Sequence, residues 1–258
     1  MKIFDTHVHY DDKAFDADRD DVLCNLKNKS VKNVTNIGCN VETSENTVNL
    51  TKKYEFMYGA VGIIPEECGN TTKEDLEKIR QMAKENKKIV AIGEIGLDYH
   101  YEDGPSKNVQ QHIFREQINI ARELGLPIVI HSRDAAEDTI KLMHEEKADE
   151  TGGVMHCYSY TWETAKILLK MGFYFGVGGV VTFKNSKKLK NVVENISLQN
   201  IVLETDGPYL APEPKRGSRN DSGNLIYVVK KIAEIKGISE DEVAETTFQN
   251  AKKLYNIN

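Results

Sequence analysis

Two histidines separated by one residue, His7 and His9, close a short apolar run near the start of the chain. In an extended strand, residues i and i+2 point to the same side, so both imidazoles can face one point. Neutral imidazole is the commonest protein ligand of transition metals. Taken alone, the pair fits buried or capping histidines as well as it fits a metal site.

Four further residues of ligand type each follow another apolar run: Glu94, His131, His156 and Asp206. Four imidazoles and two carboxylates are enough for one or two divalent ions that keep open positions for water. Such ions activate water and clamp an anionic substrate, so a metal-dependent hydrolase is the leading hypothesis. In this hypothesis Glu94 bridges two ions. Asp206 binds one ion and orients the attacking water or carries its proton.

The elements that must position these residues alternate between β-type and helical patterns. Continuous apolar runs predict about eight buried parallel strands, at residues 2–6, 31–37, 55–60, 89–93, 127–130, 153–155, 174–177 and 201–204. Apolar residues at steps of three and four predict helices at residues 16–29, 73–86, 109–124, 162–171, 224–236 and 240–254.

About eight βα units predict a (β/α)8 TIM barrel, with residues 1–258 forming a single domain. A doubly wound open sheet is the main alternative. In a TIM barrel the active site lies at the C-terminal ends of the strands. Each candidate ligand follows a predicted strand, so the barrel would gather all six at one rim.

The composition is typical of a globular enzyme, with 29% charged and 40% hydrophobic residues. The net charge of −6 provides no global basic field, so contact with nucleic acid needs a local patch or bound metal. Four scattered cysteines and the lack of an N-terminal apolar signal predict a reduced, cytoplasmic setting. No apolar run is long enough to span a membrane, and we expect a monomer or a weak oligomer.

Several basic residues are candidates for substrate binding. Arg133 follows His131 by two positions, where its guanidinium could contact phosphate or simply belong to a helix start capped by Ser132. A loop-like stretch after the last predicted strand, residues 212–219, could contact a phosphate backbone or be an ordinary solvated loop. Its basic cluster consists of Lys215, Arg216 and Arg219. Tyr99 and Tyr209 flank ligand motifs and either line the substrate cleft or pack.

Five motifs together resemble the TatD family of metal-dependent deoxyribonucleases, which belongs to the amidohydrolase superfamily. They are His7-Val-His9, Ile92-Gly-Glu-Ile-Gly-Leu-Asp-Tyr99, His131-Ser-Arg-Asp-Ala135, His156-Cys-Tyr-Ser159 and Glu204-Thr-Asp-Gly-Pro-Tyr-Leu210. The resemblance runs from residue 3 to about residue 255. It implies a TIM barrel, one or two divalent ions (Zn, Mg or Mn) and hydrolysis of phosphodiester bonds in DNA. By position, the six candidate ligands match the family's metal ligands, and Asp206 also matches the residue that handles the proton.

Two stretches depart from the family pattern. The family's Gly-x-His-Pro-His appears as Gly62-Ile-Ile-Pro-Glu66, so Ile64 stands where a histidine near the substrate is expected. This change bears on nuclease activity or on substrate preference. The family's Arg-Asn-x-Pro appears as Arg219-Asn-Asp-Ser222, without the proline.

Two alternatives to a nuclease remain. The first is an amidohydrolase-type enzyme acting on a small amide, ester or lactone. Many binuclear members of that superfamily bridge their metals with a carbamylated lysine, whereas this chain has Glu94 at the corresponding strand. The second is a non-catalytic binder, which would be expected to have lost ligands, although all six are present.

Overall fold

Residues 1–257 of the computed structural model contain eight strands that alternate with helices, as the TIM-barrel prediction requires. The chain divides into two compact units. Unit 1 comprises Met1–Asn36, Cys157–Lys166 and Tyr174–Asn258, and unit 2 comprises Ile37–His156 and Ile167–Phe173. Helix α6 (Trp162–Lys170) contributes residues to both.

Unit 1 contains two pairs of parallel strands. Strand β1 (Ile3–Val8) pairs with β2 (Val31–Ile37), and β7 (Tyr174–Val177) pairs with β8 (Ile201–Leu203). A backbone bridge between Val8 and Gly207 joins the end of β1 to the segment after β8. This bridge brings the C-terminal ends of β1 and β8 together, and predicted ligands lie at both.

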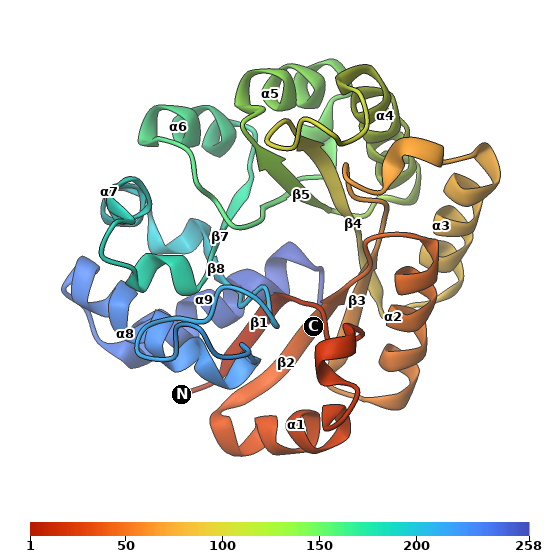
Figure 1. Cartoon of the computed structure of the whole chain (residues 1–258). Helices are drawn as coiled ribbons and strands as arrows, with labels where there is room; N and C mark the ends of the chain where they lie inside the picture. Colours follow the sequence, from red (N-terminus) through yellow and green to blue (C-terminus); the bar gives the residue numbers. More distant parts are fainter. Residues whose placement is uncertain (258) are drawn as a thin grey trace. The chain divides into compact units, whose positions relative to one another are not determined.

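The helices of unit 1 are α1 (Arg19–Asn25), α7 (Lys187–Asn195), α8 (Leu225–Lys236) and α9 (Glu240–Leu254). Helix α9 packs on β1 and β8 and lies beside α8 (Figure 1). Phe4 of β1 anchors this packing, because its ring lies 6.1 Å from the rings of both Phe248 and Tyr255. Burial of such aromatic side chains is a large apolar contribution to stability.

Unit 2 contains β3 (Met57–Val61), β4 (Ile89–Asp98), β5 (Ile128–Arg133) and β6 (Gly153–Met155), all paired in parallel in that order. Its helices are α2 (Val41–Lys53), α3 (Lys73–Glu85), α4 (Lys107–Leu124) and α5 (Ala136–Glu145). Helices α3 and α4 pack on β4, and α5 packs on β5 (Figure 1). Strand β4 is buried along its whole length.

All eight predicted strands are present, but β1, β4 and β5 run further than expected. Strand β4 was predicted to end at Gly93, and it continues to Asp98 alongside β5. A Cβ at Gly96 would collide with the carbonyl oxygen of His131, so this glycine permits close approach of the two strands. Strand β5 includes Ser132 and Arg133, so the helix start capped by Ser132 is wrong.

Helices α2, α5 and α7 were not predicted from the sequence. Across residues 1–257, no helix combines the length and the apolar character needed to cross a membrane.

Candidate metal centres

The β1–β8 cluster consists of His7, His9 and Asp206, all in unit 1. His7 belongs to β1, His9 follows it directly, and Asp206 follows β8. The backbone N–H of Asp206 donates to the carbonyl of His7 at 2.9 Å, and the N–H of His9 donates to the carbonyl of Gly207 at 2.8 Å. These two hydrogen bonds fix the three side chains relative to one another.

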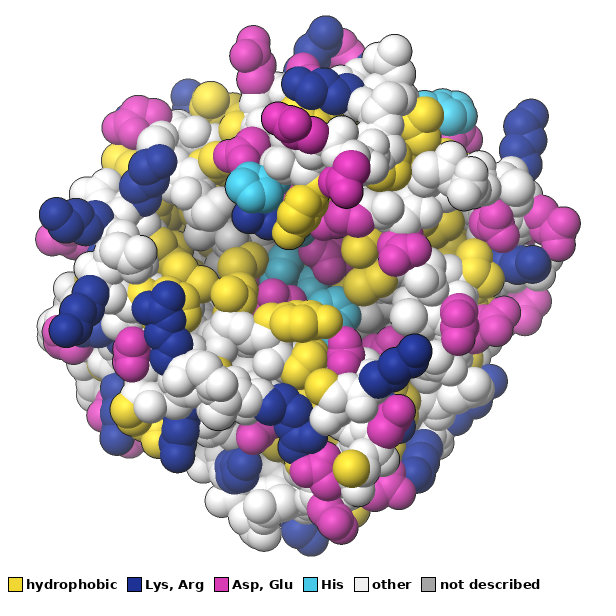
Figure 2. Space-filling view, in the orientation of Figure 1, with side chains coloured by type: hydrophobic (Ala, Val, Ile, Leu, Met, Phe, Trp, Pro, Cys, Tyr) yellow, Lys and Arg dark blue, Asp and Glu magenta, His cyan; other side chains and the backbone are white. Residues whose placement is uncertain are grey.

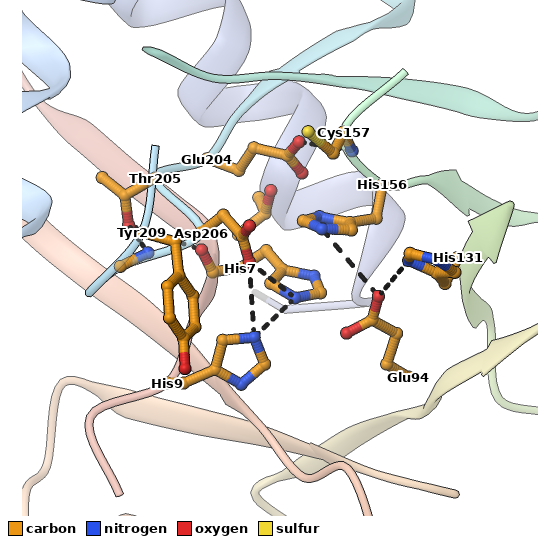
Figure 3. A network of polar contacts seen from close by, with 12 residues as sticks. His7, His9, Glu94, His131, His156, Cys157, Glu204, Thr205, Asp206 and Tyr209 are labelled. Carbon is orange, nitrogen blue, oxygen red and sulfur yellow. Dashed lines mark hydrogen bonds and ion pairs between the residues drawn. The ribbon is translucent and has the colours of Figure 1, made fainter. Parts of the chain in front are cut away.

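The three side chains of this cluster converge on a single point (Figure 3). The Nε2 atoms of His7 and His9 lie 3.2 Å apart, and they lie 3.8 and 3.4 Å from Oδ1 of Asp206. Zinc bonds of about 2.0–2.1 Å place tetrahedral donors about 3.3–3.4 Å apart. The donor separations therefore fit a divalent cation held by all three residues.

The backbone at Asp206 is in the left-handed region, with φ of 55°. Asp and Asn adopt this conformation more readily than most residues. Two imidazoles buried to 99% and 91% face a carboxylate that keeps 19% exposure of its side chain. Asp206 is thus the member of the cluster that solvent reaches most easily.

Asp5 ties the two strand ends together beneath this cluster. It is fully buried, and its carboxylate accepts hydrogen bonds from the backbone N–H of His7 and from both the N–H and the hydroxyl of Thr205. The hydroxyl of Ser222 donates to the same carboxylate at 2.6 Å. Burial raises the pKa of Asp5 to about 7, although these hydrogen bonds oppose the rise. In the sequence, Asp5 is distinguished only by sharing one side of the strand with His7 and His9.

Asp5→Ala is expected to lower the free energy of unfolding by about 3 kcal/mol, because it leaves several buried donors without their acceptor. Urea unfolding followed by circular dichroism measures the change. Asp241→Ala is the matched control, since that carboxylate is 81% exposed. A loss for Asp5→Ala no larger than for the control would contradict the tethering role.

Asn220 is a second buried residue without a predicted role. Its side-chain amide donates to the carbonyls of Thr205 and Tyr209, each at 2.9 Å, and its own carbonyl accepts from Asn224. It therefore closes the loop that carries Asp206. Asn220 belongs to the family motif Arg-Asn-x-Pro. Its hydrogen bonds to backbone carbonyls, however, could not be predicted from a single sequence.

The β4–β6 cluster consists of Glu94, His131 and His156, all in unit 2. Oε1 of Glu94 lies 3.1 Å from Nδ1 of His131 and 3.9 Å from Nε2 of His156, and it stands between the two rings in Figure 3. The backbone N–H of His156 donates to the carbonyl of Ile130, which fixes the segment after β6 against β5. Glu94 and His156 are 95% and 94% buried. Oε1 of Glu94 thus has imidazole nitrogens of two histidines near it, and imidazole and carboxylate donors are of the kind that zinc accepts.

Asp98, buried in β4, holds the other side of the His131 ring. Its Oδ2 lies 2.9 Å from Nε2 of His131, and its Oδ1 accepts from the backbone N–H of His100. Burial would lower the pKa of His131, but the hydrogen bonds that the ring donates to Asp98 and Glu94 raise it to about 10. A carboxylate on the outer nitrogen of a ligand histidine fixes the ring and raises its basicity.

Glu66 also faces this ring, with Oε1 3.9 Å from Nε2 of His131. It occupies the position of the second histidine in the family pattern Gly-x-His-Pro-His. The ligand atoms of Glu66, Asp98 and His131 all lie within 4.8 Å of one another. Both histidines of the family pattern are therefore replaced in this chain. Ile64 replaces the first, and Glu66 replaces the second and adds a carboxylate beside the predicted ligand His131.

Asp98→Asn is expected to weaken metal binding by about 10- to 100-fold, the usual effect of losing a carboxylate behind a ligand histidine. Asn keeps the shape, but it cannot accept from His131 with a full negative charge. Competition with a metal-chelating dye measures the affinity. Asp75→Asn is the control, because that carboxylate caps α3 far along the sequence from every ligand. Equal affinities for the two variants would refute the role of Asp98.

The predicted substrate-binding arginines are found in three different settings. Arg133 lies with its guanidinium carbon 5.3 Å from the centre of the Tyr101 ring and donates to the tyrosine hydroxyl at 3.2 Å. Arg216 stacks over Phe183 at 4.3 Å. Arg219 is engaged by both carboxylate oxygens of Asp18 and by the carbonyl of Ala14.

Lys215 is exposed in the loop that follows β8. On the face drawn in Figure 2, Lys and Arg side chains are scattered among Asp and Glu and form no continuous basic patch. Substrate contact by Arg133, Lys215, Arg216 and Arg219 stays a prediction, and Arg219 has a structural partner that the sequence did not reveal.

Comparison with known proteins decides the family. The family model described as "TatD related DNase" matches residues 4–256. The chain belongs to the TatD family. An uncharacterized metal-dependent hydrolase of Bacillus subtilis, YabD, is 41% identical over 256 residues, which cover 99% of this chain and all of the relative.

Two other TatD proteins extend the comparison. The chain is 30% identical to the 3'-5' ssDNA/RNA exonuclease TatD of Cronobacter sakazakii, over 98% of this chain and 97% of the relative. The crystal structure of the TatD homologue YjjV from Escherichia coli matches with a TM-score of 0.93 and 27% identity, covering 99% of this chain and 98% of that one. The predicted TIM-barrel fold and TatD resemblance are confirmed. The chain is therefore a member of a family of metal-dependent hydrolases.

Proposed function

We propose that this TatD-family chain hydrolyses phosphodiester bonds in DNA, using one or two divalent ions held by the two clusters. The observation that supports it most is the convergence of His7, His9 and Asp206, whose donor atoms stand 3.2–3.8 Å apart. Identity of 30% to a relative named as an ssDNA/RNA exonuclease supports the choice of substrate.

Each cluster has a defined share in this proposal. His7, His9 and Asp206 would hold one ion, and Glu94, His131 and His156 would hold an ion as a second donor set. A divalent cation supplies Lewis-acid polarisation of the phosphoryl oxygen and makes bound water acidic enough to react near neutral pH. That Glu94 bridges two ions stays a prediction from the sequence.

Asp206 has the additional role of general base. Its carboxylate is the partly exposed member of the β1–β8 cluster, so it can accept a proton from water while also serving as a ligand. Asp5 and Asn220 hold the backbone on either side of it and limit its movement. Arg133 and Lys215 would contact substrate phosphates, for which guanidinium and ammonium groups are suited.

The experiment that tests the function is a metal-dependence series on end-labelled DNA. Purified protein is loaded with Zn, Mg or Mn and incubated with single-stranded and double-stranded oligonucleotides, and with a panel of small amides, esters and lactones. Metal-dependent cleavage of DNA, with no comparable turnover of the small substrates, is expected. The reverse pattern would establish the amidohydrolase alternative, and DNA binding without cleavage under every metal would establish a binder.

A further inference from the structure

Tyr209 presents an unusually exposed aromatic ring on a rigid backbone. The residue is 55% exposed. Its backbone N–H donates to the carbonyl of Asp206 at 2.8 Å, and its own carbonyl accepts from Asn220 at 2.9 Å. At the other end, its hydroxyl donates to Oδ2 of Asp12 at 2.9 Å. The ring is thus fixed at both ends, while more than half of its surface faces solvent.

The ring lies next to the β1–β8 cluster. Figure 3 shows Tyr209 beside His9, and both residues belong to unit 1. The charges of His9 and Asp206 act on its phenol, whose pKa is raised mainly by burial and by Asp12. A substrate whose reacting group sits at the cluster would therefore have its neighbouring groups within reach of this ring.

Packing does not account for the fixed position of the ring. A tyrosine that stabilised the hydrophobic core would have a buried ring. The neighbouring Leu210 is also 37% exposed, so this segment contributes little to the core. A Cβ at Gly179 would collide with the carbonyl oxygen of Leu210, so the segment is pressed tightly against the turn after β7. Fixing an aromatic face before binding lowers the entropy lost when a ligand stacks on it.

The charge distribution favours a stacking contact over an electrostatic one. The net charge is −6, and the basic side chains in Figure 2 are dispersed. Attraction of the phosphate backbone to a basic surface, the usual source of affinity for nucleic acid, is therefore weak outside the bound metal. Stacking of bases on aromatic side chains is the other general source of affinity for nucleic acid, and any of the bases can stack.

We propose that Tyr209 stacks on a nucleobase of the substrate, beside the phosphodiester at the β1–β8 cluster. This inference rests on the proposed phosphodiesterase function and narrows it. A base can lie on the ring only when it is unpaired and unstacked from its neighbours.

The first test compares Tyr209→Ala and Tyr209→Phe on two single-stranded oligonucleotides, one normal and one with an abasic residue at the cleaved end. On the normal oligonucleotide, Tyr209→Ala is expected to raise KM by about tenfold or more, within the range that stacking supplies. Tyr209→Phe keeps the ring and should change KM less than threefold. On the abasic oligonucleotide the wild type and Tyr209→Ala should have similar KM values. Equal effects of Tyr209→Ala on both oligonucleotides would overturn the proposal.

A second readout does not depend on cleavage. An oligonucleotide with 2-aminopurine at its end is titrated with the metal-loaded Asp206→Asn protein and with the Asp206→Asn/Tyr209→Ala double variant. Stacking on Tyr209 should quench the fluorescence only in the first protein. If the quenching depends on Tyr209 but the wild-type protein cleaves no DNA, the proposed function is wrong and the stacking site is supported. Cleavage without such quenching would overturn the stacking site alone.

Discussion

Asp206→Asn is expected to reduce the rate of phosphodiester hydrolysis by about three orders of magnitude, since the loss of a general base alone costs about 10²- to 10⁴-fold. The substitution removes the negative charge that faces His7 and His9 at 3.8 and 3.4 Å, and with it the group that accepts the proton of water. Asparagine tolerates the positive φ at this position, so the backbone should not change. Initial rates on labelled DNA, together with metal analysis of the same preparation, provide the measurement.

The matched control for this variant is Asp134→Asn. Asp134 also has a positive φ, of 52°, and its carboxylate also contacts a histidine, His100, at 2.9 Å. Its side chain is 65% exposed, and it belongs to neither cluster. We expect the control to keep its activity within a few-fold of the wild type. Asp206→Asn protein that retained more than a tenth of the wild-type rate would exclude Asp206 as the general base.

Removal of divalent ions by a chelator is expected to abolish hydrolysis, and the affinity of the metal-free protein for zinc should rise with pH. Asp98 and Glu94 raise the pKa of His131 to about 10, against the opposing effect of burial. Below that pH the ring carries a proton on each nitrogen, so binding an ion at Nδ1 must release one. The release of one proton makes the affinity rise by about tenfold per pH unit until His131 has titrated.

The stability of the metal-free protein changes with pH in the opposite direction to the metal affinity. Because the folded pKa of His131 lies above its usual 6.5, the protonated ring stabilises the metal-free protein fully below about pH 6.5. That contribution is lost as the pH rises towards 10. Dye competition between pH 6 and 9 measures the affinity, and His131→Asn should reduce the slope by one proton per ion. An affinity that did not change with pH in the wild type would show that His131 is not a ligand.

The strands were predictable because their signal is local. A parallel strand buried on both faces is a continuous apolar run, and all eight runs became strands. The C-terminal end of β4 was not predictable, since Gly93 and Gly96 are residues that usually interrupt a strand, whereas here they allow β4 to lie close to β5. Helix α2 was missed because its Thr and Asn residues favour helices poorly. The capping box of Asn40 and Thr43 and the packing of α2 on β3 stabilise it instead.

The residues of the candidate site also differ in whether their signal in the sequence is local. The six candidate ligands could be proposed from the sequence because each ends or follows an apolar run. The structure places them in two converging sets, and metal binding by them stays a prediction. Asp5, Asp98 and Asn220 were missed, since their roles depend on partners in other segments. The same holds for Arg219, which the sequence offered as a DNA contact but which Asp18 binds.

The hydrogen bonds between Asp5 and Thr205 join two segments that are synthesised far apart in time. Asp5 and Thr205 are separated by 200 positions along the chain. A chain emerging from the ribosome presents His7 and His9 long before it presents Asp206. In the function proposed above, the β1–β8 cluster would therefore bind its ion only after the segment that carries Asp206 has been made, and a product that ends before this segment would carry the two histidines without the carboxylate.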